Sequence, residues 1–289
     1  MEKLRIGTCS WKYPSWEGLV YSAPGGIDYL HEYAQRYPTV EIDQWFWSLF
    51  ENKVVLPKAA DVENYLRAVP VDFRFTVKAP NSVTLTHPYG KVQGEAPAAN
   101  PFFLSPVVMG DFLARIEPLR ERIALLFFQF EYLNRQKMAS QGEFQQRMLE
   151  FRRRLPADLP CGLEIRNSGW LNPAFFDFLL AAELRPVLIQ GYWMPPVTQV
   201  YARHREQLLR HPLLMLRLMG SDRQGIERDA GGSWDRILWS KEEELPAIAA
   251  MIREILSAGV EIYVNINNHY EGSAPRTIAR LQALLEEAN

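Results

Sequence analysis

The sequence predicts a (β/α)8 TIM barrel formed by one domain over residues 1–289. Short apolar runs typical of buried strands recur along the chain, and helical patterns separate them. A chain of 289 residues with 47% hydrophobic composition can bury the core of such a barrel. Alternation of strand and helix favours parallel strands joined by right-handed crossovers. An open doubly wound sheet is the alternative, but no glycine-rich dinucleotide fingerprint follows the first strand, and we expect no dinucleotide cofactor.

The predicted strands are runs of apolar or alternating residues, many of them β-branched or aromatic, which suit a pleated and buried backbone. In a closed barrel their carboxyl ends form one face, the usual functional face of this fold. The eight runs cover residues 4–11, 39–44, 72–80, 123–130, 161–167, 185–192, 213–220 and 261–269.

The predicted helices place apolar residues at intervals of three and four, so that one face of each helix can cover the barrel. Among them are residues 27–37, 60–69, 110–122, 142–155, 174–184, 244–259 and 273–288.

Two connections are longer than a crossover requires, residues 81–106 after the third strand and residues 220–240 after the seventh. Each is a candidate lid or binding loop. The second is rich in glycine, whose backbone N–H groups can approach an oxyanion closely, and we expect it to bind an anion jointly with Arg217. A mobile surface loop is the alternative.

Composition narrows the class of protein. The net charge of −2 gives no overall attraction to nucleic acid or to an anionic membrane. No apolar run approaches the length of a membrane span, and the first residues enter a strand without the apolar region of a signal peptide. Cys9 and Cys161 lie in strand interiors, as small apolar side chains do. We expect a soluble cytoplasmic protein, and the sequence does not predict its oligomeric state.

Seven sequence blocks stand in a recognisable order over nearly the whole chain. They are IGTCSWKYPSWEGLVY, VEIDQWFW, FRFTVKAP, LLFFQF, LEIRNSGW, RLMG and NINNHYEGSAPRTIARL. In this order they resemble the blocks of the YecE-like bacterial proteins, known as domain of unknown function 72. The resemblance implies a TIM barrel but brings no established reaction.

Polar residues stand at the predicted carboxyl ends of most strands, where an apolar core would continue with Val or Ile. Side chains two apart on a strand share a face, so these residues are expected to converge on one pocket. The predicted catalytic residues are Glu41, Lys78, Glu164 and His269. The predicted substrate-binding residues are Trp11, Asp43, Gln129, Arg166, Gln190, Arg217, Asn265, Asn267 and Asn268.

These residue types suit acid–base chemistry. Glu41 and Glu164 are candidates for general acid and base, and His269 is the histidine at a predicted strand end. Lys78 is either a cation that holds a carboxylate or phosphate or, if its pKa is lowered, an amine nucleophile. The structural alternative is a set of buried ion pairs that orient one another.

The residues at the strand ends offer few metal ligands. One histidine and three acids disfavour a trinuclear zinc site, whereas a single Mg²⁺ or Mn²⁺ on Glu41, Asp43 or Glu164 is left open. Gln129 and Arg217 occupy the ends of strands four and seven, where many retaining glycosidases of this fold carry acids.

The sequence therefore predicts an enzyme of the hydrolase, lyase or isomerase class that acts on a polar or anionic small molecule. A sugar-like or nucleotide-like ligand would bind between acids, bases and aromatic rings at the mouth of the barrel. Two alternatives use the same face: a binding protein without turnover, and a nucleic-acid processing protein that binds single-stranded or damaged DNA.

Overall fold

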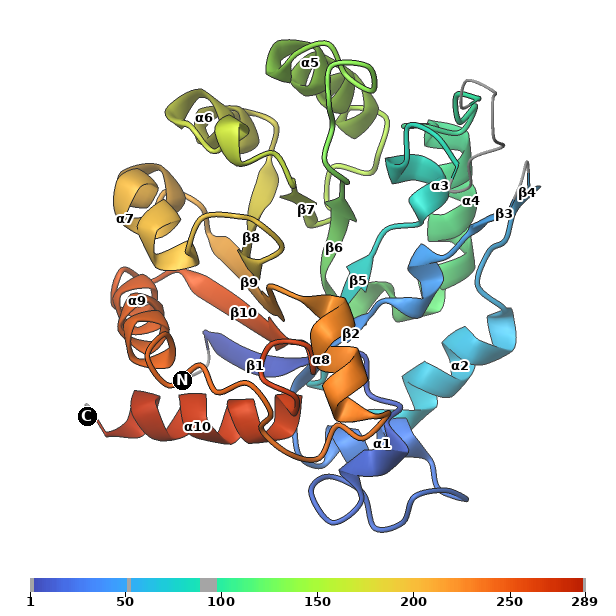
Figure 1. Ribbon diagram of the computed structural model, residues 1–289. Helices are drawn as coiled ribbons and strands as arrows, with labels where there is room; N and C mark the ends of the chain where they lie inside the picture. Colours follow the sequence, from blue (N-terminus) through green and yellow to red (C-terminus); the bar gives the residue numbers. More distant parts are fainter. Residues whose placement is uncertain (1–2, 51–52, 89–97, 288–289) are drawn as a thin grey trace.

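Eight strands pair in parallel around a closed ring, and helices surround it (Figure 1). This computed structural model describes residues 3–50, 53–88 and 98–287. The predicted fold class is confirmed. The strands are β1 (Leu4–Cys9), β2 (Thr39–Ile42), β5 (Arg74–Lys78), β6 (Ile123–Gln129), β7 (Cys161–Glu164), β8 (Leu184–Gly191), β9 (Leu213–Gly220) and β10 (Glu261–Ile266). Around the ring they follow the order β1-β10-β9-β8-β7-β6-β5-β2.

A helix follows each barrel strand and packs an apolar face against it. Side-chain caps satisfy backbone N–H groups in the first turn of several of these helices, and the caps of α1, α4, α5 and α6 are Asp28, Ser105, Ser140 and Asn172. No helix in the described ranges is long and apolar enough to cross a bilayer. The outer helices are α1 (Tyr29–Ala34), α2 (Ala59–Ala68), α4 (Pro106–Ile116), α5 (Gln141–Arg152), α6 (Pro173–Ala181), α7 (Val197–Leu208), α9 (Leu245–Ser257) and α10 (Ala274–Glu286).

Additional elements lie in the connections at the carboxyl ends of the strands. A hairpin of β3 (Leu49–Phe50) and β4 (Lys53–Val54) follows β2. The long connection after β5 begins with α3 (Asn81–Thr84), and residues 89–97 of this predicted lid lie outside the described residues. The connection after β9 contains α8 (Arg223–Ala230). This helix ends at Gly231, whose positive φ of 56° suits glycine.

The interior of the barrel has an apolar layer toward the amino ends of the strands. Its members are buried and contact one another, and they are Leu125, Phe127, Val187, Leu213, Met215 and Tyr263. The larger apolar core lies outside the ring, between the strands and the helices. Both faces of each strand are therefore covered, as parallel sheets require.

Backbone meets backbone where β8, β9 and β10 end, and glycine makes this contact possible. A Cβ atom on Gly191 would lie 2.0 Å from the carbonyl oxygen of Gly220. A Cβ atom on Gly220 would lie 2.2 Å from the carbonyl oxygen of His269. Both glycines also have positive φ angles, 124° and 78°. We call this contact the glycine seam, and it fixes one wall of the barrel mouth.

Candidate functional site

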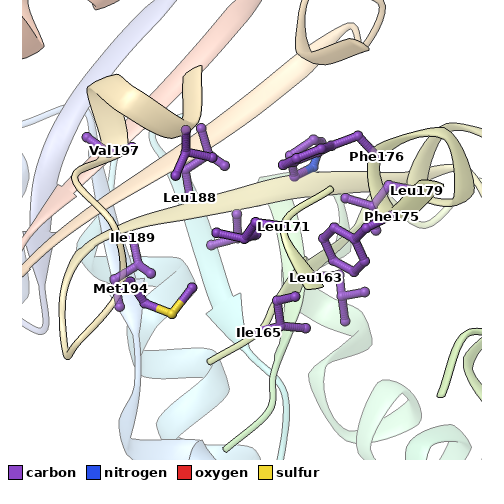
Figure 2. Close-up of a pocket in the computed structure, with 13 residues that line it drawn as sticks. Leu163, Ile165, Leu171, Phe175, Phe176, Leu179, Leu188, Ile189, Met194 and Val197 are labelled. Atoms are coloured by element: carbon purple, nitrogen blue, oxygen red, sulfur yellow. The ribbon is translucent and has the colours of Figure 1, made fainter. Parts of the chain in front are cut away.

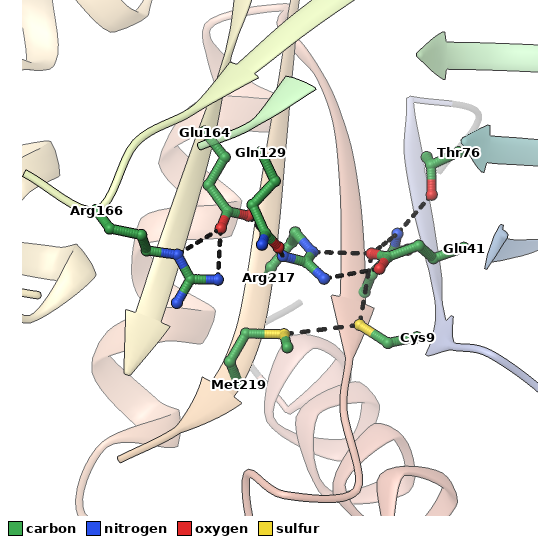
Figure 3. A network of polar contacts seen from close by, with 9 residues as sticks. Cys9, Glu41, Thr76, Gln129, Glu164, Arg166, Arg217 and Met219 are labelled. Carbon is green, nitrogen blue, oxygen red and sulfur yellow. Dashed lines mark hydrogen bonds and ion pairs between the residues drawn. The ribbon is translucent and has the colours of Figure 1, made fainter. Parts of the chain in front are cut away.

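A buried ion network crosses the barrel one pleat above the apolar layer (Figure 3). Arg217 of β9 lies at its centre with only 2% of its surface exposed. Its Nε and Nη2 donate to the two carboxylate oxygens of Glu41, at 2.8 and 2.7 Å. Its Nη1 donates to Oε2 of Glu164 at 2.6 Å and to Oε1 of Gln129 at 3.2 Å. Residues from β2, β6, β7 and β9 thus meet at one guanidinium.

Arg166 binds the other side of Glu164. Its Nε and Nη2 lie 2.8 and 2.7 Å from Oε1 of Glu164, and its guanidinium stacks 4.3 Å from the centroid of the Tyr192 ring. No acceptor in the described part of the chain contacts Nη1 of Arg166. The Arg166 side chain is 15% exposed, whereas that of Arg217 is 2% exposed.

The network also includes three side chains that were not among the predicted site residues, those of Thr76, Cys9 and Met219. Asn265 Nδ2 donates to the hydroxyl of Thr76 at 2.6 Å, and the same nitrogen lies 3.4 Å from Oε2 of Glu41. The thiol of Cys9 lies 3.5 Å from that Glu41 oxygen and 3.8 Å from Sδ of Met219. The alternation that selected Glu41 and Lys78 also places Thr76 and Cys9 inside the barrel, but neither residue type suggested a role.

The network fixes the charge of its members. Burial alone would raise the pKa of Glu164, but the guanidinium groups of Arg166 and Arg217 outweigh it and lower that pKa. Burial likewise opposes the charge of Arg217, yet Glu164 and Glu41 raise its pKa well above the ordinary value. Burial and the Glu41 carboxylate raise the pKa of Cys9, so its sulfur is a neutral thiol.

Asp43 and Lys78 lie next to each other at the ends of adjacent strands. Ile42 pairs with Val77, so Asp43 directly follows β2 at the level of Lys78, the last residue of β5. Besides burial, the charges of Glu41, Lys78 and Arg217 affect the pKa of Asp43, which indicates that its carboxylate lies near them. The ammonium of Lys78 lies 3.6 Å from the centroid of the Phe46 ring, in the short 3₁₀ helix Gln44–Phe46.

These two groups are poised near neutral pH. Burial and then the Glu41 carboxylate raise the pKa of Asp43 from 3.8 to about 6. Burial and then the Arg217 guanidinium lower the pKa of Lys78 from 10.5 to about 8. Among the described residues, no oxygen accepts a hydrogen bond from the Lys78 ammonium. The arginines occupy the carboxylates of Glu41 and Glu164, which leaves Lys78 without an ion-pair partner in the network.

His269 lies apart from this network, beside α8. Its Nε2 is 3.1 Å from Oε1 of Glu227, and its ring packs edge to face with Trp234 at 5.2 Å. Burial and the guanidinium of Arg223 lower the pKa of His269, so the ring is neutral at pH 7. We expected His269 to lie near Glu164 and Lys78. The contacts of its ring among the described residues do not include either of them.

The amides after β10 build a turn. Oδ1 of Asn267 accepts a hydrogen bond from the backbone N–H of His269 at 2.9 Å. Oδ1 of Asn268 accepts from the N–H of Ala274, at the start of α10, also at 2.9 Å. Backbone N–H groups in a buried turn need hydrogen-bond acceptors. The two asparagine side chains supply them, which explains why both residues are polar.

Two predicted residues face away from the mouth. Gln190 Nε2 donates to Oε2 of Glu244 at 2.8 Å, and its Oε1 accepts from the backbone N–H of Val197. The physical reason is alternation: Ile189 pairs with Arg217 and faces the interior, so Gln190 faces the helices. Trp11 is 5% exposed and packs edge to face against Tyr65, 5.1 Å away, in the layer of α2. The contacts that the structure shows therefore bring neither side chain into the ion network.

The anion site expected between Arg217 and the loop after β9 is also not supported by the geometry. Arg217 already gives its Nε and both Nη atoms to protein oxygens and is fully buried. Arg166 is the arginine of the network with a donor available to a ligand. The catalytic and binding roles of the predicted residues stay predictions.

The carboxylates of the mouth do not fit the Mg²⁺ or Mn²⁺ site that the sequence left open. Both oxygens of Glu41 and both oxygens of Glu164 already accept hydrogen bonds from arginine. A metal ion would have to displace a guanidinium to reach them. In the ranges that the structure describes, no three His, Cys, Asp or Glu side chains form a group that could hold a metal ion.

A separate cavity lies outside the barrel, among β7, β8, α6 and α7 (Figure 2). Apolar side chains line it, including Leu163, Phe175, Leu188 and Val197. Its volume of about 20 Å³ holds no more than about one water molecule, and the side chains that line it are those of apolar residues. It is therefore a packing defect and not a ligand site.

Comparison with known proteins identifies a family but does not assign a reaction to its members. The UPF0759 protein YunF of Bacillus subtilis is 24% identical over 267 residues, which cover 89% of this chain and 86% of that protein. Two solved structures share the fold. A DUF72 family protein from Enterococcus faecalis has a TM-score of 0.69 and 20% identity, over 98% of this chain and 95% of that one. One from Thermotoga maritima has a TM-score of 0.67 and 23% identity, over 98% and 99%. The family model described as "Protein of unknown function DUF72" matches residues 5–289, and the chain therefore belongs to the DUF72 family.

Proposed function

We propose that the barrel mouth is the active site of an enzyme that acts on a small polar or anionic molecule by acid–base chemistry. The observation that carries the proposal is the unpaired ammonium of Lys78, held beside Asp43 above a saturated ion network. A buried cation without a protein partner is costly, so its place in the mouth favours a ligand that supplies the partner.

The saturated network acts as a rigid platform. Glu41, Glu164 and Arg217 hold one another through short charge-assisted hydrogen bonds, so none of them is free to change partners easily. Burial, and then the Glu41 carboxylate, raises the pKa of Asp43. Burial, and then the Arg217 guanidinium, lowers the pKa of Lys78, although Glu41 and Glu164 oppose this second shift. Both groups are thereby brought toward the pH at which proton transfer is efficient.

Two cationic donors are then available to the ligand, the Lys78 ammonium and Nη1 of Arg166. Together they favour a carboxylate or a phosphate group. Tyr192, stacked on Arg166, adds an aromatic surface beside this position. These features suit a sugar-like or nucleotide-like molecule, and Asp43 is the group placed to give or take its proton. Proton transfer of this kind is a step in many hydrolase, lyase and isomerase reactions.

The proposal is tested by ligand-dependent thermal shifts at pH 7 with phosphate, citrate, glucose 6-phosphate and AMP. We expect at least one of them to raise the Tm of the wild-type protein, because a ligand at about 100 times its Kd adds ~2.7 kcal/mol of stability. Arg166→Gln should weaken that binding at least tenfold, or ~1.4 kcal/mol.

The matched control is Arg147→Gln, which removes an exposed arginine whose partner is Glu143, one helical turn away on α5. It should leave the ligand shift unchanged. Equal shifts in the two variants, or no shift in the wild type, would count against the mouth as an anion site. Any ligand found is then incubated with the protein and followed by NMR. Conversion supports an enzyme, whereas binding without conversion supports the binding-protein alternative.

A further inference from the structure

The cations of the mouth differ in a way that matters chemically. Arginine stands wherever a carboxylate must be held, at positions 166 and 217. Lysine stands at position 78, where the described residues offer no oxygen acceptor. Arginine stays protonated in proteins, whereas lysine can lose its proton and attack a carbonyl carbon. The ion pairs need a cation that stays protonated, which arginine provides. At position 78 no ion pair is formed among the described residues, and there the ability of lysine to lose its proton can be used.

The surroundings of Lys78 suit a nucleophilic amine. Lys78 is the last residue of β5 and is half-buried, at the carboxyl end of the strand that faces the mouth. One side of the nitrogen lies against the Phe46 ring, which cannot accept a proton or form a conventional hydrogen bond. Burial, and then the nearby Arg217 guanidinium, disfavours the charged form of Lys78 and so increases the share of neutral amine at pH 7 to 8.

A proton donor for the reaction lies on the adjacent strand. Asp43 follows Ile42, which pairs with Val77 beside Lys78, and its raised pKa keeps part of its population protonated near pH 6 to 7. A carboxylic acid next to a lysine can protonate a leaving hydroxyl and then stabilise the cation that remains. Arg166 can hold an anionic group of the same molecule.

We propose that Lys78 forms a reversible imine with an aldehyde or ketone that also carries a carboxylate or phosphate group. This proposal rests on the proposed function of the mouth and names its substrate class. The neutral amine of Lys78 adds to the carbonyl carbon, a C–N bond forms, and a proton moves from nitrogen to oxygen to give a carbinolamine. Asp43 then donates a proton to the hydroxyl group, which leaves as water while the nitrogen lone pair forms the C=N bond. The products are a protonated imine, the Asp43 carboxylate and one water molecule, and no electrons are transferred to or from an external group.

Reductive trapping tests the proposal on the whole protein. Wild-type protein is treated with sodium cyanoborohydride and one of four carbonyl compounds: pyruvate, glyoxylate, dihydroxyacetone phosphate and formaldehyde. Peptide mass spectrometry then locates the added groups. Formaldehyde is the smallest probe and reports the reactivity of Lys78 whatever the true substrate is. At pH 8 we expect Lys78 to react at least tenfold faster than Lys58, an exposed lysine before α2, because about half of it is neutral at a pKa near 8.

Two variants separate the chemistry from simple exposure. Lys78→Arg keeps the charge but cannot form an imine, and should lose the adduct at this position while Lys58 is labelled as before. Asp43→Asn keeps the amine and removes the proton donor, and should slow trapping of the larger compounds at least tenfold. Labelling of Lys78 no faster than Lys58 with formaldehyde, or equal trapping in wild type and Asp43→Asn, would overturn the proposal.

The outcome also separates this inference from the proposed function. If anions bind in a manner that depends on Arg166 but Lys78 is not trapped by any of the four compounds, the imine is wrong and the acid–base site stands. If Lys78 is trapped selectively although the anion panel produces no thermal shift, the imine stands and the anion preference is wrong.

Discussion

The barrel interior contains two successive layers of opposite chemistry. Met215, Tyr263 and Phe127 belong to the apolar layer, and Arg217, Asn265 and Gln129 follow each of them by two positions on the same strand. The apolar layer fills its space with side chains that need no partner. The ionic layer, which is the next level of inward-facing side chains in the same barrel, consists of groups that each require several hydrogen bonds.

The difference between the layers indicates what each one is for. An apolar layer is sufficient to close a barrel of this size, as the lower half of the same barrel demonstrates. Buried ion pairs give little net stability compared with apolar residues of similar volume. The upper layer is therefore better explained by the groups that it polarises, Asp43 and Lys78, than by a contribution to folding.

The largest expected effect comes from breaking the ionic layer at its centre. Arg217→Met leaves the carboxylates of Glu41 and Glu164 buried without their main partner, and should lower the free energy of unfolding by at least ~3–5 kcal/mol. Urea denaturation at pH 7 measures the loss.

A matched change in the apolar layer sharpens the comparison. Met215→Ala should also cost ~2–5 kcal/mol, through a cavity, but it should leave the binding of anions unchanged. Replacing the whole ion triad, with Glu41→Gln, Glu164→Gln and Arg217→Met together, should recover most of the loss in the single variant. A triple variant as unstable as Arg217→Met would show that the network does stabilise the fold.

The second expected effect, from removing the carboxylate of Asp43, is an increase in the free energy of unfolding. Burial raises the pKa of Asp43 above its unfolded value of 3.8 to about 6, so the folded protein holds this proton more tightly than the unfolded chain. The resulting stability is fully present below about pH 4 and is lost as the pH rises through 6. At pH 7 the ionised carboxylate is a cost of roughly 2–3 kcal/mol.

Asp43→Asn removes this cost and should therefore raise the free energy of unfolding at pH 7. The gain should shrink toward zero at pH 4, and urea denaturation at several pH values checks the slope. A variant that is less stable than wild type at pH 7 would mean that Asp43 is held as a favourable ion in the folded protein.

The smallest effect concerns the residue that faces outward. Gln190→Leu leaves the N–H of Val197 without its acceptor and should cost only ~1–2 kcal/mol. Ligand shifts and imine trapping should remain as in wild type, because this side chain bonds to Glu244 and not to the ion network. Loss of ligand binding in a stable Gln190→Leu protein would place Gln190 in the mouth after all.

Much of the ionic layer was predictable from alternation along regular strands. Glu41, Gln129, Glu164 and Arg217 lie within strands, where every second residue faces the interior, and all four meet as expected. Their pairing was not predictable. Arg217 and Glu41 are 176 residues apart, and only the closure of the ring brings them together.

Alternation failed where the strands end. Trp11 follows Cys9, the last residue of β1, and Ser10 between them has a φ of +65° that turns the chain away from the strand direction. His269 and Asn268 likewise follow β10, which ends at Ile266, and their side chains obey the geometry of a turn. The expected orientation of Gln190 differs from the observed one for another reason. Its polarity suggested that it faces the interior of the barrel, but Ile189 occupies that face.

The glycine seam limits how this site can diversify over evolutionary time. Any side chain at Gly191 or Gly220 would collide with backbone, so the wall formed by β8, β9 and β10 tolerates no ordinary single substitution at these two points. Around the ring, β2 and β5 lie across from this wall, and their ends carry Asp43 and Lys78. Relatives that acquire new substrates are therefore expected to do so by changing the turns after β2 and β5, while the opposite wall is inherited as a fixed template.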